Sequence, residues 1–148
     1  MLKRTVAALV LTLALGTQAL AVGSVDLELE GDPNYRTGNR LIKEKDYAAA
    51  LPHLQKVAAE WPQKPEAQNL LGFTHRKLRN YPAAKQFYDA ALALDPSYRP
   101  ALEYQGMWFI EMGEMASAKV NLEKLRRICA MCEETADLEK AIATGVTH

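Results

Sequence analysis

One sequence window, which recurs three times along this chain, constrains its fold more than any other feature. The window from Pro65 to Tyr98 reads as two short helices joined by a polar turn, and Asp95-Pro96 closes it. The same window, moved without gaps, also fits Gly31 to Lys64 upstream and Arg99 to Cys132 downstream. One helix pair cannot bury its apolar face alone, so such units stack and about three are needed for stability.

Small residues recur at equivalent positions of the three windows. Glycine occupies positions 38, 72 and 106, and alanine occupies positions 50, 84 and 118. We expect these residues to lie where the two helices of a unit approach most closely, because larger side chains would separate them. A proline closes the first two windows, at positions 62 and 96, whereas Ala130 stands there in the third. The third unit is therefore atypical.

These spacings identify a family. With Leu71-Gly72, Tyr81, Ala84, Tyr88, Ala91 and Pro96 in place, the chain closely resembles the tetratricopeptide repeat family. The resemblance implies an all-α fold, a short right-handed solenoid of three helix-turn-helix repeats followed by a C-terminal capping helix. The expected segments are 31–64, 65–98 and 99–132 for the repeats and 133–148 for the capping helix and tail. Within the last segment, residues 133–143 are expected to be helical and residues 144–148 to fray.

Residues 1–21 have the features of a secretory signal peptide. A basic start at Lys3-Arg4 precedes an apolar run from Val6 to Gly16, and Ala19-Leu20-Ala21 predicts cleavage after Ala21. An uncleaved anchor is the alternative, but a spanning helix needs about 20 apolar residues. We expect a periplasmic or secreted bacterial protein with no membrane span after cleavage. Residues 22–30 are acidic and are predicted to form a flexible lead-in.

The charge balance argues against two classes of partner. The whole chain has 18 basic and 18 acidic residues, and loss of Lys3 and Arg4 with the leader makes the counts 16 and 18. A slightly acidic mature chain favours neither nucleic acid nor an anionic membrane surface. We therefore expect a protein or peptide partner, and self-association through an exposed end of the solenoid stays open.

The family resemblance also predicts where a partner binds. In tetratricopeptide proteins the first helix of each unit lines a concave groove that holds an extended peptide or a helix. The expected inward positions are Tyr35, Asn39, Ile42 and Lys43, then Asn69, Phe73, Arg76 and Lys77, then Glu103, Met107, Ile110 and Glu111. We expect apolar anchors to seat near Phe73 and Met107, while Lys43, Arg76 and Lys77 steer an acidic segment.

One subclass of the family is excluded by its site residues. Domains that clamp the terminal carboxylate of chaperones use asparagine and basic side chains at five groove positions. Those positions hold Tyr35, Asn39, Leu70, Pro100 and Tyr104 here, and only Asn39 matches. Without its charges, such a clamp does not hold a carboxylate well.

The two cysteines form the sequence Cys129-Ala130-Met131-Cys132. In an oxidising compartment, a disulfide that staples the capping helix is the main expectation. Thiol-redox activity is the alternative, although a pair that closes a helix lies at the wrong end of the helix dipole for a thiolate. Copper(I) binding through both cysteines, with Met131 as a third ligand, also stays open. Glu133 stands where haem attachment requires histidine, which excludes that chemistry.

The sequence contains no recognisable enzyme motif. It has no glycine-rich phosphate loop, no paired-histidine metal motif and no nucleophile elbow. We expect His75 to be a packed, hydrogen-bonded residue that faces the second helix of its own unit. The sequence therefore predicts no enzymatic activity, no cofactor and no resident metal. The stretch from Ile128 to Ile142 is similar to the tails of small exported tetratricopeptide proteins of proteobacteria, which implies a periplasmic setting.

Overall fold

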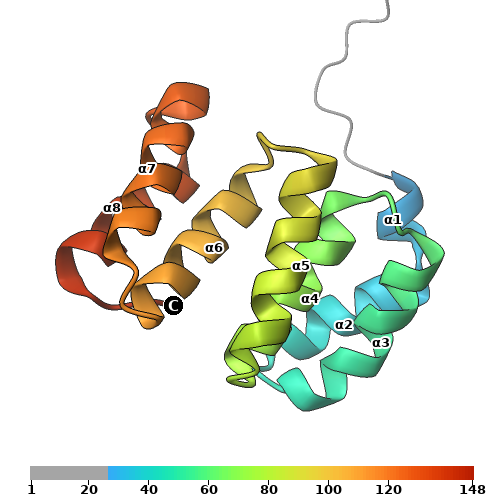
Figure 1. Cartoon of the computed structure of the whole chain (residues 1–148). Coiled ribbons are helices and arrows are strands. Elements are labelled where there is room, and N and C mark those ends of the chain that lie inside the picture. Colours follow the sequence, from blue (N-terminus) through green and yellow to red (C-terminus); the bar gives the residue numbers. More distant parts are fainter. Residues whose placement is uncertain (1–26) are drawn as a thin grey trace, which may run out of the picture.

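The computed structural model describes residues 27–148, which contain eight helices and no strand. Successive helices pair in an antiparallel manner, and the pairs stack along the chain (Figure 1). The helices are α1 (Leu27–Gly31), α2 (Pro33–Lys43), α3 (Tyr47–Glu60), α4 (Pro65–Lys77), α5 (Tyr81–Leu94), α6 (Arg99–Glu111), α7 (Met115–Cys129) and α8 (Glu133–Thr144). The helix pairs α2 with α3, α4 with α5 and α6 with α7 lie within the three expected repeat segments, and α8 lies within the fourth segment. The predicted signal peptide lies outside the described residues.

The sequence repeat is visible in the backbone of the turns. Lys45, Arg79 and Gly113 each have a positive φ, at 61°, 60° and 77°, in the turn between the two helices of a unit. At each turn the next residue donates a backbone hydrogen bond five residues back, as from Asp46 to Leu41 and from Asn80 to His75. The three units therefore make the same turn, and only the third has the glycine that this conformation favours.

The connections between units repeat as well. The amide of Lys64 donates to the carbonyl of Trp61, that of Tyr98 to Asp95, and that of Cys132 to Cys129. Lys64, Tyr98 and Cys132 are the N-caps of α4, α6 and α8. Because these caps recur at the spacing of the sequence repeat, α8 begins where the first helix of a fourth unit would begin.

The predicted close contacts at glycine exist in the first two units. An added Cβ at Gly38 would lie 2.6 Å from Leu54, and one at Gly72 would lie 2.6 Å from the ring of Tyr88. The third unit differs from the expectation, since a Cβ at Gly106 would meet Leu138 of α8 at 2.6 Å. The capping helix therefore packs directly against α6.

The last part of the predicted acidic lead-in, residues 27–30, is helical. Residues 22–26 lie outside the described residues, but α1 begins at Leu27, and Leu29 is completely buried against Val57 and Ala67. Asp32 then caps α2 by accepting hydrogen bonds from the amides of residues 34 and 35. The prediction of a flexible segment up to residue 30 was wrong because Leu29 has a core partner that alternation along the chain does not reveal.

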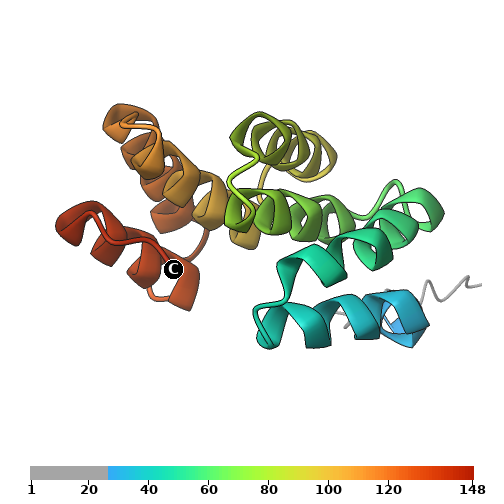
Figure 2. The ribbon, with the colours of Figure 1, turned by 90° about the horizontal axis from the view of Figure 1, so that it is seen from below.

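The stacked pairs curve, and α2, α4, α6 and α8 lie toward the inner side (Figure 2). Tyr88, Leu54, Leu71, Leu102 and Leu125 are among the large side chains that are fully buried between the layers. This stacking holds the inner helices in a fixed order, and their exposed faces form one surface.

The contact at Gly72 predicts a large effect of a small substitution. Gly72→Ala should lower the free energy of unfolding by about 1 to 3 kcal/mol, because the ring of Tyr88 is fully buried and has little room to move. Urea denaturation would measure the change. Gly31→Ala is the matched control, since nothing lies within 4 Å of its added Cβ, and its effect should stay within about 0.5 kcal/mol. Equal effects of the two substitutions would contradict the close-contact account.

Candidate functional site

The inner face carries an aromatic patch centred on Phe73, which is half-buried on α4. Its ring centroid lies 6.0 Å from that of Tyr47 and 5.0 Å from that of Tyr104. The cationic groups of Arg76 and Lys77 lie 5.6 and 5.5 Å from the centroid of the same ring. Phe73 was predicted, whereas Tyr47 and Tyr104 were not proposed as ligand contacts. We call Tyr47, Phe73 and Tyr104 the aromatic patch.

The structure corrects the predicted role of Arg76. Its side chain is 1% exposed, and Nη1 lies 2.5 Å from Oε1 of Glu111 on α6. Burial opposes the charge of Arg76, but the neighbouring Tyr88 and Glu111 outweigh it and raise the pKa of the guanidinium. A buried, paired arginine joins α4 to α6 and does not steer a partner from solvent. Lys77 remains half-buried and Lys43 exposed.

Two other predicted contacts are closed to a partner in this structure. Met107 is completely buried in a core cluster with Leu138 and Ala141 of α8, so it is not an anchor at the surface. Asn69 is 3% exposed, and within the described chain its Oδ1 has no hydrogen-bond partner. Ile110 is half-buried and packs against the same cluster as Met107. The sequence placed these positions on the correct helices but did not show what covers them.

An open depression of about 490 Å³ lies at the α2 end of the molecule. It is lined by Glu30, Tyr35, Arg36, Asn39, Arg40 and Lys43. Three of these residues were predicted to face the groove, while the depression also includes two arginines that sequence reasoning missed. Arg36 precedes Asn39 by three residues and Arg40 precedes Lys43 by three, and this helical spacing was the signal that could have revealed them. Arg36, Arg40 and Lys43 are basic, although Arg40 is also paired with Glu44 at 2.8 Å, and we call this site the basic depression.

At the opposite end, residues 145–148 fold back onto the inner helices. We call these residues the tail. Arg76 Nη2 donates to the main-chain oxygen of His148 at 2.6 Å, and the Thr147 hydroxyl donates to Glu111 at 2.7 Å. The predicted fraying at residues 144–148 was therefore wrong, because the inner face supplies partners for Thr147 and His148.

The imidazole of His148 contacts a buried carboxyl group. Its Nε2 lies 3.1 Å from Oε1 of Glu103, whose side chain is 7% exposed. Burial, assisted by Asp137, Glu134 and Glu133, raises the pKa of Glu103 to about 8, and burial lowers that of His148. The distance is that of an ion pair, but both pKa shifts favour a neutral hydrogen bond in which the protonated carboxyl donates to Nε2.

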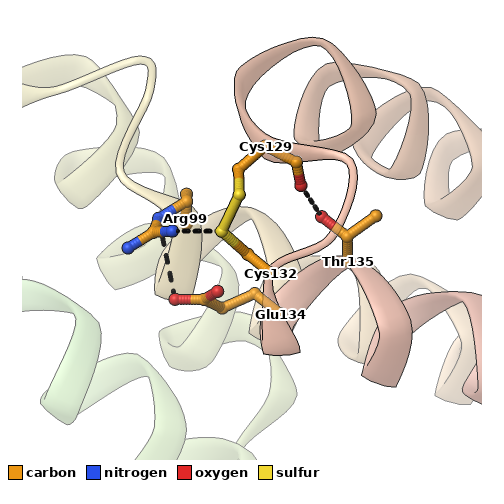
Figure 3. The surroundings of a disulfide bond; sticks show 5 residues. All are labelled: Arg99, Cys129, Cys132, Glu134 and Thr135. Carbon is orange, nitrogen blue, oxygen red and sulfur yellow. Dashed lines mark hydrogen bonds and ion pairs between the residues drawn. A yellow bond between two sulfur atoms is a disulfide. The ribbon is translucent and has the colours of Figure 1, made fainter.

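Cys129 and Cys132 are joined by a disulfide, as predicted, across the turn between α7 and α8 (Figure 3). Their Cα atoms are 5.5 Å apart, and the Thr135 hydroxyl donates to the carbonyl of Cys129 at 2.7 Å. Arg99 Nη1 donates to Sγ of Cys132 at 2.6 Å. The dipole argument from sequence holds for Cys129, the last residue of α7, but is wrong for Cys132, which is the N-cap of α8.

His75 lies where the sequence predicted. It is 9% exposed and its ring stacks on Phe87 of α5, with centroids 5.3 Å apart and planes 6° from parallel. A contact of 3.3 Å joins its Nδ1 to Nδ2 of Asn80. His75 is therefore a packing residue of the second unit.

Comparisons with known proteins agree with this architecture. Residues 41–104 match the profile of a family described as tetratricopeptide repeat. Over this stretch the chain is similar to tetratricopeptide repeat proteins, and its all-helical fold agrees with that likeness. A comparison with curated protein sequences finds no match. Among residues 27–148, no helix is both long and apolar enough to cross a membrane.

Several solved structures share the fold. The first tetratricopeptide domain of human RPAP3 is 20% identical, with a TM-score of 0.68 over 80% of this chain and 90% of that one. The first such domain of Spaghetti (RPAP3), bound to an HSP90 peptide, is 20% identical, with a TM-score of 0.64 over 80% of this chain and 93% of that one. The type III secretion translocator chaperone SycD of Yersinia enterocolitica is 17% identical, with a TM-score of 0.67 over 79% and 87%. At these identities the likeness shows the fold.

The pair of Arg76 and Glu111 yields a testable prediction. Glu111→Gln should lower the free energy of unfolding by about 2 to 4 kcal/mol, because it leaves a buried guanidinium without its counter-charge. The double variant Arg76→Met with Glu111→Gln should lose less, since it removes both charges. Urea denaturation of the three proteins checks this order.

The control for that cycle is an exposed ion pair of the same chain. Arg40 and Glu44 are 59% and 52% exposed, so Glu44→Gln should change stability by no more than about 0.5 kcal/mol. If Glu111→Gln lowered the free energy of unfolding as little as Glu44→Gln does, the buried pair would not join α4 to α6.

Glu103 predicts a pH dependence of stability. Its pKa of about 8 exceeds the ordinary value of 4.5, so the folded chain keeps a proton that the unfolded chain releases, and stability falls as pH rises toward 8. Urea denaturation at pH 6.5 and pH 8 should show this loss, and Glu103→Gln should reduce it. This range avoids His148, whose lowered pKa acts with the opposite sign below about 6.5. Identical pH slopes for variant and wild type would refute the assignment.

Proposed function

We propose that this chain is an exported interaction module that binds an extended segment of a partner protein along its inner face. The observation that carries the proposal is the half-exposed aromatic patch together with the open basic depression. Solenoids present such extended concave surfaces to their ligands, and aromatic side chains contribute strongly to binding. Two of the similar solved domains hold chaperone peptides, which supports a peptide ligand here.

The charge of the face suggests the chemistry of the partner. Arg36, Arg40 and Lys43 line the basic depression, and Lys77 lies beside Phe73. An acidic stretch fits this end, with an apolar or aromatic side chain set against the patch. The binding determinants proposed here are therefore Lys43 and Phe73 with the newly found arginines, while Arg76 holds the helices in place.

Export rests on the leader sequence of residues 1–21, which predicts delivery to the periplasm or the exterior. The disulfide is compatible with such a compartment, where paired cysteines persist. Its loop is so short that its closure stabilises the chain by only about 2 kcal/mol on the entropic account. We propose that the disulfide holds the turn before α8, where the other two units have proline.

Photo-crosslinking tests the function. A photoreactive residue at position 73 should capture one partner in the native host, and Lys43→Glu should reduce that capture by about tenfold through lost electrostatic attraction. The same probe at position 56, which is exposed on α3, is the matched control and should capture no such partner. Lys56→Glu controls for the change in net charge.

Mass spectrometry would identify the captured protein and the residues joined to position 73. Capture that is equal from positions 73 and 56, or unaffected by Lys43→Glu, would contradict binding at the inner face.

A second candidate function is thiol exchange, and the contact between Arg99 and Cys132 favours it. When the thiolate of an external dithiol attacks Sγ of Cys129, the bond between the sulfurs breaks and Cys132 leaves as a thiolate. Arg99 and the N-terminus of α8 would stabilise that charge. The second thiol of the reductant then resolves the mixed disulfide, so two electrons pass to this chain.

Redox titration with thiol labelling separates a working pair from a staple. A staple requires a potential below about −300 mV, whereas a working pair exchanges readily with glutathione. If the pair works, Arg99→Gln should shift the potential to a more negative value, because the reduced form loses its stabilising cation. An unchanged potential in that variant would eliminate the role of Arg99.

A further inference from the structure

We propose that the tail is an intramolecular occupant of the partner-binding face and that a partner must displace it from α4 and α6. This inference rests on the proposed function, since it concerns the regulation of the same face. The contacts of the tail also indicate which chemical groups of a partner the covered part of the face binds.

The contacts of the tail come from four residues on the inner helices. Arg76 of α4 binds the main-chain oxygen of His148, while Glu111 of α6 accepts from Thr147. Glu103 of α6 contacts the imidazole, and the ring of Tyr104 lies 6.2 Å from it, edge to face. Tyr104 also belongs to the aromatic patch. The tail therefore reaches the surface on which the partner is proposed to bind.

The way in which α8 ends directs the tail toward the inner face. Gly145 has a φ of 71°, and its amide donates to the carbonyl of Ala141, which ends the helix and turns the chain inward. The following residues have no helical or strand hydrogen bonding. Val146 is 71% exposed, whereas Thr147 is half-buried. The segment thus binds through the consecutive side chains of Thr147 and His148 and through the main chain of His148.

Few contacts hold the tail on the inner face, so a partner can displace it. The side chain of His148 remains 55% exposed, and Val146 makes no core contact. Its attachment consists of a few hydrogen bonds, each modest in water because solvent replaces it. Helix α8 keeps its own anchors, Leu138 and Ala141, in the core. Release of the tail therefore leaves the capping helix in place.

The groups that the tail covers define the partner segment. Glu111 accepts a hydrogen bond from a hydroxyl group, protonated Glu103 donates one to an imidazole nitrogen, and Arg76 donates one to a main-chain oxygen. An extended segment with a hydroxyl-bearing side chain next to a neutral imidazole would replace these contacts. The basic depression lies at the other end of the face, so the segment is acidic at one end and carries the hydroxyl and imidazole groups at the other. This order of groups fixes the direction in which it binds.

The tail also explains a cluster that has the composition of a metal site. Ligand atoms of Glu103, Asp137 and His148 lie within 4.8 Å of one another. The contact of Glu103 with His148, and the shifts of both pKa values, account for this arrangement through a neutral hydrogen bond. EDTA is present in the peptide-binding titrations, so a bridging cation cannot produce a difference in affinity between the variants.

A peptide with the sequence of residues 141–148, AIATGVTH, tests the proposal when labelled with a fluorophore at its first residue. Anisotropy titrations compare the full wild-type chain with the full-length variant Thr147→Val, His148→Ala, whose own tail has lost its side-chain contacts. The variant should bind the peptide about tenfold more tightly, because its face is no longer occupied. Val146→Ala is the matched control and should behave as the wild type does, since Val146 points into solvent.

Nuclear magnetic relaxation of backbone amides gives an independent readout. Residues 147 and 148 should have order parameters of about 0.85 in the wild type and below about 0.6 in the double variant. Mobile amides in the wild type, or equal peptide affinity for variant and wild type, would overturn the inference. Either result leaves capture at position 73 standing. Absence of capture at position 73 in the double variant, whose face the tail no longer occupies, would instead overturn the proposed function.

Discussion

The close approach of paired helices at glycine is the constraint on which the structure depends. A Cβ at Gly38 or Gly72 would fall 2.6 Å from the facing side chain, a separation that packed atoms do not reach. The first two pairs can therefore close in this way only with glycine at this position, and Gly106 has the same role in the contact of α6 with α8. The closed pairs stack in the same way because the same turn recurs once in every unit, and the inner face is the product of that stacking.

The inner face has three regions with different chemistry. The basic depression is open, the aromatic patch is half-covered, and the surface of α6 is occupied by α8 and the tail. Arg76 stands at the junction between the last two regions, where it contacts the ring of Phe73, Glu111 and the tail. This residue links the stability of the α4 and α6 contact to the occupancy of the face. A segment that displaces the tail would therefore act on a group that also joins two repeats.

The register of the repeats was sufficient to predict the helices, because the same residues recur at the same offsets in each unit. It also predicted the environment of His75, whereas the pairing of the cysteines was predicted from their proximity in an expected oxidising compartment. The exposure of the groove residues could not be predicted, because it depends on which helix of the following unit packs against them. Met107 and Phe73 occupy equivalent positions, yet Met107 is covered by Leu138 of α8, whereas Phe73 meets the less enclosing Tyr104. Leu29 and the tail escaped prediction for the same reason, because their partners are distant in sequence.

The most direct test of binding at the inner face is a map of chemical shifts on the isotope-labelled chain as the partner segment is added. The account predicts the largest changes at the amides of Asn39, Lys43, Phe73 and Lys77, together with the release of residues 147 and 148. Changes confined to the outer helices α3, α5 and α7, with the tail still rigid, would contradict it.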